Sequence, residues 1–388
     1  MSVERAAADL EAAASAPVLQ TGRFKSPVVI ASIEVLERAG HYFVRTRSTD
    51  GAEGLAVTTE RMAYLHLLLA QCVAPAFIGQ DARKLEGLIE RAYVYRSNYK
   101  LAGLALWCCV AWIELSLLDL LGKAAGAPVG ELLGGVVRSE VPIYVASGRR
   151  ETTPEQEVEG LQQAVAETGA KAVKFKLGGR MSQDADSLPG RSEALIRLAR
   201  AGLGDDMAIH ADANGSYSVP EAIRIGRLLE EIGAFFYEEP CPFDQLEETK
   251  AVADALAIPV AGGEQETSLR RFRWLIENDG VQVVQPDVQY NGGLIRTIRV
   301  ARMAERAGVP TTLHISGEPG FIYTLHFASC VPNIGVYQEY KGTRRLGALF
   351  DPPLAAVDGR VTIPAGPGLG MVHLEDRLQG AQVLAKVN

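Results

Sequence analysis

Along most of the chain, short apolar runs alternate with segments in which apolar residues recur at helical spacing. Near its start, Val28–Glu37 and His41–Arg47 are rich in Val, Ile and aromatic residues and flank Ala39-Gly40. This pattern predicts a β-hairpin that ends at the turn Thr49-Asp50-Gly51. From about residue 59 to residue 135 the apolar positions follow the helical period instead. The beginning of the chain is therefore predicted to be a small α+β domain.

One helical segment, Leu101–Leu121, is apolar enough to raise the question of a membrane span. Its stretch Leu101–Ile113 contains no charged residue, but Glu114 and Asp119 follow within the same segment. The segment therefore falls short of the roughly 20 apolar residues that a span requires. We predict a buried helix, and no association with a membrane.

Beyond this domain the chain repeats a unit of one strand and one helix. Helical segments such as Pro220–Ile232 and Gly293–Ala307 separate short apolar runs that are predicted to be strands. The predicted strands are Val141–Ala146, Ala172–Leu177, Met207–Ala211, Ala234–Tyr237, Ile258–Ala261, Val281–Val284, Thr311–His314 and Gly335–Gln338. This succession predicts an α/β fold, a (β/α)8 barrel of the TIM type with the first domain as an N-terminal α+β cap.

After about Gly347 the chain becomes rich in turns, as in Asp351-Pro352-Pro353 and Pro364–Gly370. Such a segment suits a tail that packs back on the cap rather than another unit of the barrel. The predicted organisation is a cap at residues 1–136, a barrel at 137–347 and a returning C-terminal segment at 348–388.

Composition agrees with this organisation. The length of 388 residues accommodates a barrel of roughly 250 residues and a second domain. Apolar residues make up 47% and charged residues 22% of the chain, and a net charge of −8 argues against a nucleic-acid-binding surface. The five cysteines show no CxxC spacing, so reduced thiols are expected. Because Met1–Pro17 carries charges such as Glu4 and Arg5 and lacks a signal-peptide pattern, a cytoplasmic location is expected.

Ionisable residues stand at or near the ends of the predicted barrel strands. Seven of them are separated by 23 to 36 residues, about the length of one strand and one helix. They are Lys176, Asp212, Glu238, Glu264, Asp287, His314 and Glu339. In such barrels the C-terminal strand ends build the active site, whereas the strand interiors form a packed core. The pattern therefore indicates a catalytic mouth.

Three of these residues, Asp212, Glu238 and Glu264, stand on consecutive predicted strands and can converge on one point. Without a cation, their mutual repulsion would raise some of their pKa values in a poorly hydrated cleft. Oxygen ligands with no Cys or His among them favour Mg²⁺ or Mn²⁺ over zinc. Any one of them alone could be a solvated loop acid, but three in register indicate a metal site.

Two lysines, Lys174 and Lys176, share one side of the second predicted barrel strand, because residues i and i+2 face the same way. Repulsion between the two ammonium groups and partial burial would lower a lysine pKa. Lys176 is then a candidate general base, and Lys174 a candidate to hold an anionic group of the substrate. A KxK sequence alone usually marks a solvated face, but its place one unit before Asp212 favours function.

On the other side, Asp287 and His314 are expected on adjacent strands. The aspartate can accept a hydrogen bond from one imidazole nitrogen and leave the other for proton transfer. A buried His–Asp pair can be purely structural, but opposite a lysine base and beside three metal ligands we favour catalysis. Glu339, on the last predicted strand, is expected to donate a hydrogen bond to a substrate carboxylate if neighbouring acids raise its pKa.

These residues and their neighbours resemble the sequences of the enolase superfamily, mandelate racemase subgroup. The matching stretches are Val173–Gly178, Ala211–Gly215, Tyr237–Pro240, Gly263-Glu264, Gln285–Asp287, His314 and Glu339, with Gly122-Lys123 and Leu132–Gly135 in the cap. The resemblance implies Mg²⁺ bound by Asp212, Glu238 and Glu264. It also implies that Lys176 and the His314–Asp287 pair act as bases on opposite faces of the substrate.

The implied reaction removes a proton α to a carboxylate. Such a proton is very weakly acidic, so the enediolate needs positive charge and hydrogen bonds that strengthen as charge develops. We expect Mg²⁺, Lys174 and protonated Glu339 to supply these. The intermediate can lose a β-hydroxyl to give a 2-keto-3-deoxy acid, or be reprotonated on the opposite face.

We favour an acid-sugar dehydratase, because the resemblance implies that many members with this base pair dehydrate sugar acids and because His314 can protonate the leaving hydroxyl. A racemase or epimerase of a 2-hydroxy acid is the alternative. A Schiff-base aldolase would not need three metal carboxylates, and a sugar-acid binding protein would not need the complete set of bases. The expected partners are a small-molecule carboxylate and further copies of the chain in a homo-oligomer.

Substrate recognition is the least readable part of the sequence. Asn214, two residues after Asp212, is a candidate substrate contact at the barrel mouth. In the cap, Tyr99, Lys100 and Arg23 are candidates to meet a distal carboxylate, as in an aldarate, although they could equally be exposed loop residues. Glu114 stands where relatives commonly carry aspartate, and it is expected to concern packing between the domains.

Overall fold

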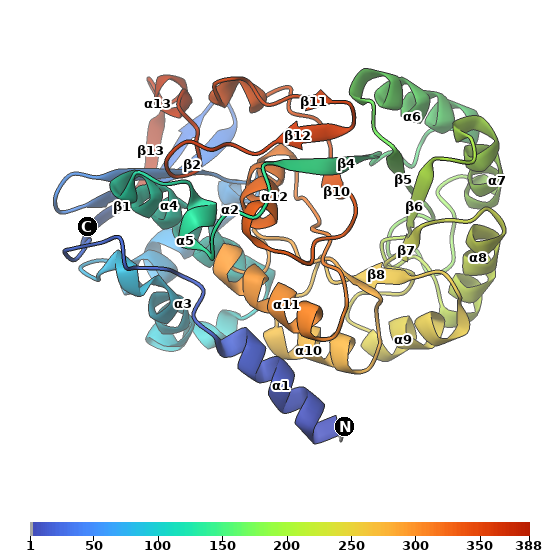
Figure 1. Ribbon diagram of the computed structural model, residues 1–388, viewed down its shortest axis with the longest axis horizontal. Helices are drawn as coiled ribbons and strands as arrows, with labels where there is room; N and C mark the ends of the chain where they lie inside the picture. Colours follow the sequence, from blue (N-terminus) through green and yellow to red (C-terminus); the bar gives the residue numbers. More distant parts are fainter. Residues whose placement is uncertain (1–2) are drawn as a thin grey trace.

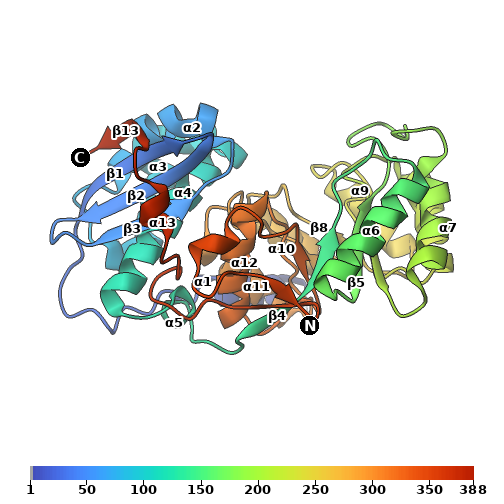
Figure 2. The same cartoon turned by 90° about the horizontal axis from the view of Figure 1, so that it is seen from above.

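The computed structural model describes the backbone of residues 3–388 and the side chains from residue 8 onward, and the chain forms a cap beside a barrel (Figure 1, Figure 2). The cap is built on an antiparallel sheet with the strand order β13-β1-β2-β3. The bounds are β1 (Ile30–Arg38), β2 (His41–Ser48), β3 (Glu53–Val57) and β13 (Gln382–Val387). Because β13 pairs with β1, the C-terminal segment completes the cap, which confirms that prediction.

Helix α4 (Leu104–Ala125) packs against β2 and β3. Among the described residues it is the one helix long and apolar enough to cross a membrane, but 89% of its most apolar window is buried inside the protein. The predicted buried helix is therefore confirmed. The other cap helices are α2 (Met62–Leu68), α3 (Leu85–Val94) and α5 (Val129–Leu132), with shorter π- and 3₁₀-helical turns at Leu69–Val73, Ala74–Ala76, Ala82–Lys84 and Tyr95–Leu101.

The barrel consists of parallel strands that pair in sequence order from β4 to β9. Their bounds are β4 (Glu140–Ala146), β5 (Ala172–Lys176), β6 (Ala208–Asp212), β7 (Phe236–Glu238), β8 (Val260–Gly262), β9 (Val283–Val284) and β10 (Gln338–Tyr340). Isolated parallel bridges join Val284 to Thr311 and Thr311 to Ile334, and β10 pairs with β4. The pairing thus continues around the ring, as a (β/α)8-type fold requires.

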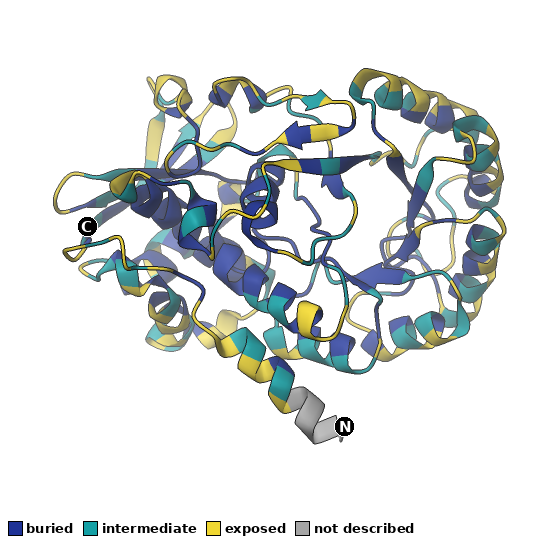
Figure 3. Ribbon diagram, in the orientation of Figure 1, coloured by how far each residue is buried: buried dark blue, intermediate teal, exposed yellow. Residues whose placement is uncertain are grey.

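Helices follow the strands and surround the ring. They are α6 (Pro154–Thr168), α7 (Arg191–Leu203), α8 (Val219–Glu231), α9 (Leu246–Ala255), α10 (Leu269–Glu277), α11 (Leu294–Arg306) and α12 (Glu318–Cys330). The outer helices α6 to α9 are buried on the face turned to the strands and exposed on the other (Figure 3). This is the amphipathic pattern from which they were expected. By contrast, α12 is buried along nearly its whole length, because cap residues and the C-terminal segment cover it.

Two further segments attach to the barrel. Helix α1 (Val3–Ser15) packs against α10 and α11, and the Arg302 guanidinium donates a 2.6 Å hydrogen bond to the carbonyl oxygen of Ala16. Of the segment Met1–Pro17 considered above, Met1 and Ser2 lie outside the described residues. After the 3₁₀ turn Gly347–Leu349, strands β11 (Ala356–Val357) and β12 (Arg360–Thr362) extend the sheet beside β4, and helix α13 (Leu374–Arg377) precedes β13.

The structure corrects the sequence prediction at three elements. The hairpin of β1 and β2 ends at the turn Thr49–Gly51 as predicted, but a third strand that was not predicted follows, because β3 pairs Glu53–Val57 with β2 and buries its apolar residues under α4. The segment Thr311–His314 forms isolated bridges at its two ends rather than a continuous strand. The last barrel strand is Gln338–Tyr340 rather than Gly335–Gln338, because Gln338 is the first residue in register with β4.

Two buried carboxylates of α4 join the cap to the rest of the molecule, and we call their surroundings the cap–barrel seam. Glu114 accepts hydrogen bonds from the backbone amides of Leu294 (3.2 Å) and Ile295 (2.8 Å), the first residues of α11. Asp119 accepts from the amides of Leu55 and Leu369, each at 2.8 Å. The contact with α11 confirms that Glu114 concerns packing between the domains.

Candidate active site

The register of the parallel strands brings the candidate residues to one end of the barrel. Lys176 of β5 is the partner of Asp212 at the end of β6, and Asp212 is the partner of Glu238 at the end of β7. Glu264 follows two residues after the end of β8. One oxygen atom of each carboxylate lies within 4.8 Å of the others, and all three side chains are buried. A cluster of this kind can hold a cation with hard oxygen ligands.

Side-chain alternation along β5 explains why two lysines point into the barrel. Phe175 belongs to the apolar core shared by the barrel strands and the surrounding helices. Lys174 and Lys176 therefore point the other way, toward the barrel axis. The sequence supplies both the outward apolar residue and the two inward cations.

The structure places Lys174 beneath the carboxylates and not in contact with the cavity. Its Nζ donates to Glu238 Oε1 and Oε2 at 2.8 and 2.7 Å and lies 3.0 Å from Glu339 Oε1. Burial alone would lower the pKa of Lys174, but Glu238 and Glu339 outweigh it and raise the pKa well above the ordinary value. Lys174 was expected to hold an anionic group of the substrate, but the anions that it faces are Glu238 and Glu339 of the protein itself. The ammonium group is a fixed counter-charge for the carboxylates.

The carboxylates of the cluster differ in their protonation. Burial disfavours the charge of Asp212, but Lys176 and Lys174 outweigh it and hold its pKa below the ordinary range. Lys176 Nζ donates directly to Asp212 Oδ2. Burial and the neighbouring Asp212 instead raise the pKa of Glu238 to about 8. The raised pKa of Glu238 agrees with the prediction that repulsion among three converging acids raises some of their pKa values.

On the opposite side of the triad, His314 and Asp287 form a direct contact. His314 Nδ1 lies 2.8 Å from Asp287 Oδ2, and His314 Nε2 lies 3.5 Å from Glu264 Oε2. The other oxygen of Asp287 accepts from the backbone amides of Gln289 (2.7 Å) and Tyr290 (3.1 Å). Because these amides fix the aspartate, the imidazole is held with Nε2 toward the triad.

Glu339 lies beneath the cavity, and its two carboxylate oxygens face a backbone amide and two lysines. Its Oε2 accepts a 2.8 Å hydrogen bond from the backbone amide of Ile315, and Oε1 lies 3.0 Å from Lys174 Nζ and 3.3 Å from Lys341 Nζ. Burial acts against ionisation, but the two lysines hold the pKa of Glu339 well below its ordinary value. The structure thus contradicts the expected protonated Glu339 that donates a hydrogen bond.

Two residues that follow barrel strands, Asn214 after β6 and Glu239 after β7, have positive φ angles, which are unusual for residues other than glycine. Asn214 has φ of 42° and Glu239 has φ of 41°. Such conformations cost of order 1–3 kcal/mol each and are common at functional sites. Asn214 lines the cavity, accepts from Arg150 Nη2 at 2.6 Å and donates to Glu239 Oε2 at 3.3 Å. Burial and then Glu264 raise the pKa of Glu239 well above its ordinary value.

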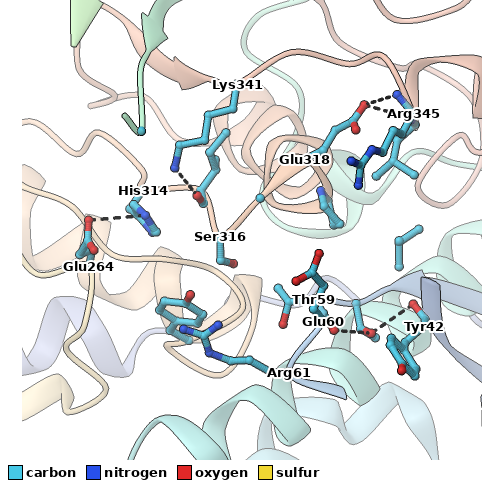
Figure 4. A pocket seen from close by; sticks show the side chains of 18 of the residues that line it. Tyr42, Thr59, Glu60, Arg61, Glu264, His314, Ser316, Glu318, Lys341 and Arg345 are labelled. Atoms are coloured by element: carbon cyan, nitrogen blue, oxygen red, sulfur yellow. Dashed lines mark hydrogen bonds and ion pairs between the residues drawn. The ribbon is translucent and has the colours of Figure 1, made fainter. Parts of the chain in front are cut away.

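A cavity of about 430 Å³ lies between the cap and the mouth of the barrel. Barrel residues on its wall include Lys176, Asn214, Glu264, His314 and Lys341. Figure 4 shows the labelled side chains of the wall converging from both domains, with His314 beside Glu264. Of the triad only Glu264 reaches the wall, whereas Asp212 and Glu238 lie behind it.

The cap contributes residues 40–42 and 57–61 to this wall, not the predicted ones. Tyr99 and Lys100 are exposed on the 3₁₀ turn between α3 and α4. Arg23 forms an exposed ion pair with Glu131, 3.1 Å apart. The structure therefore does not bring Tyr99, Lys100 or Arg23 to the cavity.

Several residues of the site were not singled out from the sequence. Gln285 Nε2 donates to Glu238 Oε2 at 2.9 Å, and Lys341 Nζ donates to the Ile315 carbonyl at 2.8 Å. Both had a signal in the sequence, because Gln285 stands two residues before Asp287 and Lys341 stands two residues after Glu339. Arg61 and Tyr290 had none, because their place on the wall depends on how the cap docks.

Two families match most of the chain. Residues 13–134 match the family described as mandelate racemase / muconate lactonizing enzyme, N-terminal domain. Residues 156–377 match the family described as enolase C-terminal domain-like. The second match alone covers more than half of the 388 residues and includes β5 to β10.

Similar proteins extend over both domains. The arabinonate dehydratase of Saccharolobus solfataricus is 27% identical over 83% of this chain and 85% of its own length. The D-galactarolactone cycloisomerase of Agrobacterium fabrum is 30% identical over 92% of this chain and 94% of its own. A solved structure of the mandelate racemase/muconate lactonizing protein of Paracoccus denitrificans PD1222, complexed with magnesium, has a TM-score of 0.85 and 30% identity, covering 92% of this chain and 99% of that one. With the buried triad, this similarity indicates a divalent-metal site.

Proposed function

Because this chain belongs to the mandelate racemase/muconate lactonizing enzyme family of the enolase superfamily, we propose that it is a Mg²⁺-dependent acid-sugar dehydratase. It removes the proton α to the carboxylate of a sugar acid and then eliminates the β-hydroxyl as water, which leaves a 2-keto-3-deoxy acid. Relatives named as dehydratases of arabinonate, of L-talarate and galactarate, and of D-galactonate support this choice.

One observation carries the proposal: a lysine and a His–Asp pair stand at the two ends of one carboxylate triad. Lys176 contacts Asp212 at one end, and His314 Nε2 lies 3.5 Å from Glu264 Oε2 at the other. Both bases also line the cavity. A substrate carboxylate at the triad would therefore have one group that can accept the α-proton and, on the other side, a second group that can transfer a proton in the next step.

The residues of the triad fit a magnesium ion. They offer carboxylate oxygens alone, and Glu264 Oε2 is buried without a hydrogen-bond partner among the described residues. Lys174 and Gln285 hold Glu238 in place through hydrogen bonds of 2.7–2.9 Å. When bound, Mg²⁺ supplies the positive charge that stabilises the enediolate.

The remaining steps fall to the side chains. Lys176 Nζ is the candidate to accept the α-proton. Asp287 keeps the Nδ1 proton of His314, so His314 Nε2 faces the triad and can transfer a proton to the leaving hydroxyl. With the same residues, His314 could instead return a proton to the α-carbon, which would give an epimer. The cycloisomerase among the relatives shows that the family is not confined to dehydration.

The test is a screen of aldonic and aldaric acids with the full-length protein in Mg²⁺, with 2-keto acids detected as semicarbazones. We expect turnover of at least one acid and its complete loss in EDTA, with recovery on added Mg²⁺. Proton NMR in D₂O separates the alternatives, because deuterium at C2 without a keto product would indicate an epimerase. Thermal stabilisation by sugar acids with neither exchange nor turnover would contradict the proposed enzyme and indicate a binding protein.

A further inference from the structure

The cap side of the cavity holds a cation that the reaction proposed above does not use. Arg61 ends the segment 57–61, which leads from β3 to α2 and lines the cavity. It immediately precedes the first residue of α2, so the start of this helix fixes its backbone. Figure 4 shows its side chain extending from the cap toward the side of the cavity that holds His314.

The guanidinium of Arg61 is held by an aromatic ring. Its Cζ lies 5.0 Å from the ring centre of Tyr290, and that ring centre lies 6.0 Å from the ring of His314. Tyr290 therefore neighbours both Arg61 and His314, the candidate acid–base residue. Stacking on a ring positions a guanidinium without using its N–H groups, so all five donors stay available to a ligand.

Arg61 has no anionic partner among the residues that the structure describes. Its side chain is half-buried, and none of the described hydrogen bonds or ion pairs involves its guanidinium. Partly desolvated cations without a partner are unfavourable. An anion that enters the cavity would remove this cost.

The other cations of the wall are in different situations. Lys176 contacts Asp212, and Lys341 lies 3.3 Å from Glu339, so each already faces a carboxylate of the protein. Arg180 and Arg345 are exposed. Among these wall cations, Arg61 alone is partly buried and has no carboxylate partner among the described residues.

We propose that Arg61 binds a second carboxylate at the far end of the substrate, and that the substrate is therefore a sugar diacid. This inference rests on the proposed function, in which the first carboxylate of the substrate lies at the triad. A guanidinium matches a carboxylate with two parallel hydrogen bonds, which a terminal hydroxymethyl group cannot reproduce. Arg61 thus takes the role that the sequence suggested for Lys100 or Arg23, neither of which reaches the cavity.

The experiment compares diacids with monoacids of the same carbon skeleton: galactarate with galactonate, glucarate with gluconate, and mannarate with mannonate. Values of kcat and KM are measured in Mg²⁺ for the wild type, Arg61→Met and Arg61→Lys. Arg96→Met is the matched control, because the Arg96 guanidinium also stacks on a cap tyrosine, 5.2 Å from the Tyr95 ring centre, but lies outside the cavity wall. Thermal unfolding shows whether each variant is folded.

We expect the wild type to prefer the diacid of its best pair and Arg61→Met to lose about 10- to 100-fold in kcat/KM on that diacid. The loss should appear mainly in KM, since the distal carboxylate is bound equally before and during the reaction. Turnover of the monoacid should be nearly unchanged, Arg61→Lys should recover part of the preference, and Arg96→Met should behave as the wild type.

A folded Arg61→Met protein that keeps its kinetics on the diacid, or that loses equally on both members of a pair, would overturn the assignment of Arg61. So would a wild type that prefers the monoacid. These outcomes differ from failure of the proposed function, in which the wild type shows neither turnover nor α-proton exchange with any acid of the panel.

Discussion

The protein buries carboxylates in two regions, and it satisfies them in different ways. In the cap–barrel seam, Glu114 and Asp119 each accept hydrogen bonds from two backbone amides. Asp119 also pairs with Lys123 of its own helix at 2.8 Å. At the barrel mouth, Asp212 accepts one hydrogen bond from a backbone amide, that of Asn214, but Asp212, Glu238 and Glu264 mainly face lysines and one another. The seam uses its carboxylates to hold two segments of chain together, whereas the mouth leaves carboxylate oxygens that a ligand can still bind.

A perturbed pKa does not separate the two regions. The pKa of Glu114 and the pKa of Glu238 are both raised to about 8, in each case chiefly by burial. What differs is the partners, because backbone amides are fixed and neutral, whereas the mouth concentrates charges of both signs. The functional carboxylates are therefore recognised by oxygen atoms that are buried but still free to bind a ligand, and not by burial alone.

The largest expected effect is a loss of activity when an acid–base residue of the barrel mouth is replaced. Lys176→Ala and His314→Asn should each reduce kcat by about 10³-fold or more, because each removes one of the two acid–base groups. Both variants should still fold, which thermal unfolding checks, although Lys176→Ala removes the partner of a buried carboxylate and should lower the unfolding midpoint. One of the two variants is expected to continue exchanging the α-proton with D₂O, which identifies the base that acts first. Full dehydration by both variants would remove these residues from the chemistry.

The next comparison uses metal affinity. Glu238→Ala should weaken Mg²⁺ binding by more than the 10–100-fold typical of outer-shell changes, because it removes a proposed ligand. Glu114→Gln alters an equally buried carboxylate of the seam and should bind Mg²⁺ as the wild type does. Isothermal titration calorimetry measures both. Unchanged affinity in Glu238→Ala would show that the triad is not the metal site.

Much of the barrel could be predicted from the sequence because its determinants are local. Runs such as Ala172–Leu177 carry the strand pattern and end in the ionisable residue, and the parallel register then brings Lys176, Asp212 and Glu238 together. The direction in which Lys174 points was equally predictable from alternation. Its partners were not, because Glu238 and Glu339 reach it from β7 and β10, two strands that do not pair with β5.

The cap side of the site was not predictable for a related reason. Arg61 lies at the cavity only because the cap packs on the barrel, and its guanidinium stacks on the ring of Tyr290, which lies in the loop after β9. No spacing in the sequence links these two positions. Lys100 and Arg23 have the same charge but lie on surfaces that the docking leaves outside the cavity. Residue type and spacing were enough to predict site residues whose positions are set by one sheet. They were not enough for residues that meet only when the two domains pack together.

A smaller effect is expected in the seam and concerns stability. Asp119→Ala leaves the buried amides of Leu55 and Leu369 without an acceptor and should lower the free energy of unfolding by roughly 2–3 kcal/mol. Asp119→Asn keeps one acceptor oxygen and should cost less. Urea denaturation measures the losses, and kcat of the folded variants should be near the wild-type value. A large loss of kcat in folded Asp119→Asn would mean that the seam takes part in catalysis.

The last expected effect is a dependence of stability on pH that comes from Glu114. Burial raises its pKa from 4.5 to about 8, so between these values the native state holds a proton that the unfolded chain has released. The contribution of Glu114 is therefore fully present below pH 4.5 and is lost as the pH rises toward 8, by at most about 1.4 kcal/mol per pH unit. Glu114→Gln has no such proton, and its side-chain oxygen can still accept from the start of α11. The difference in unfolding free energy between the wild type and Glu114→Gln should thus shift in favour of the variant from pH 5 to pH 8. Parallel pH profiles of the two proteins would show that Glu114 is ionised in the native state and that its two amide hydrogen bonds outweigh its burial.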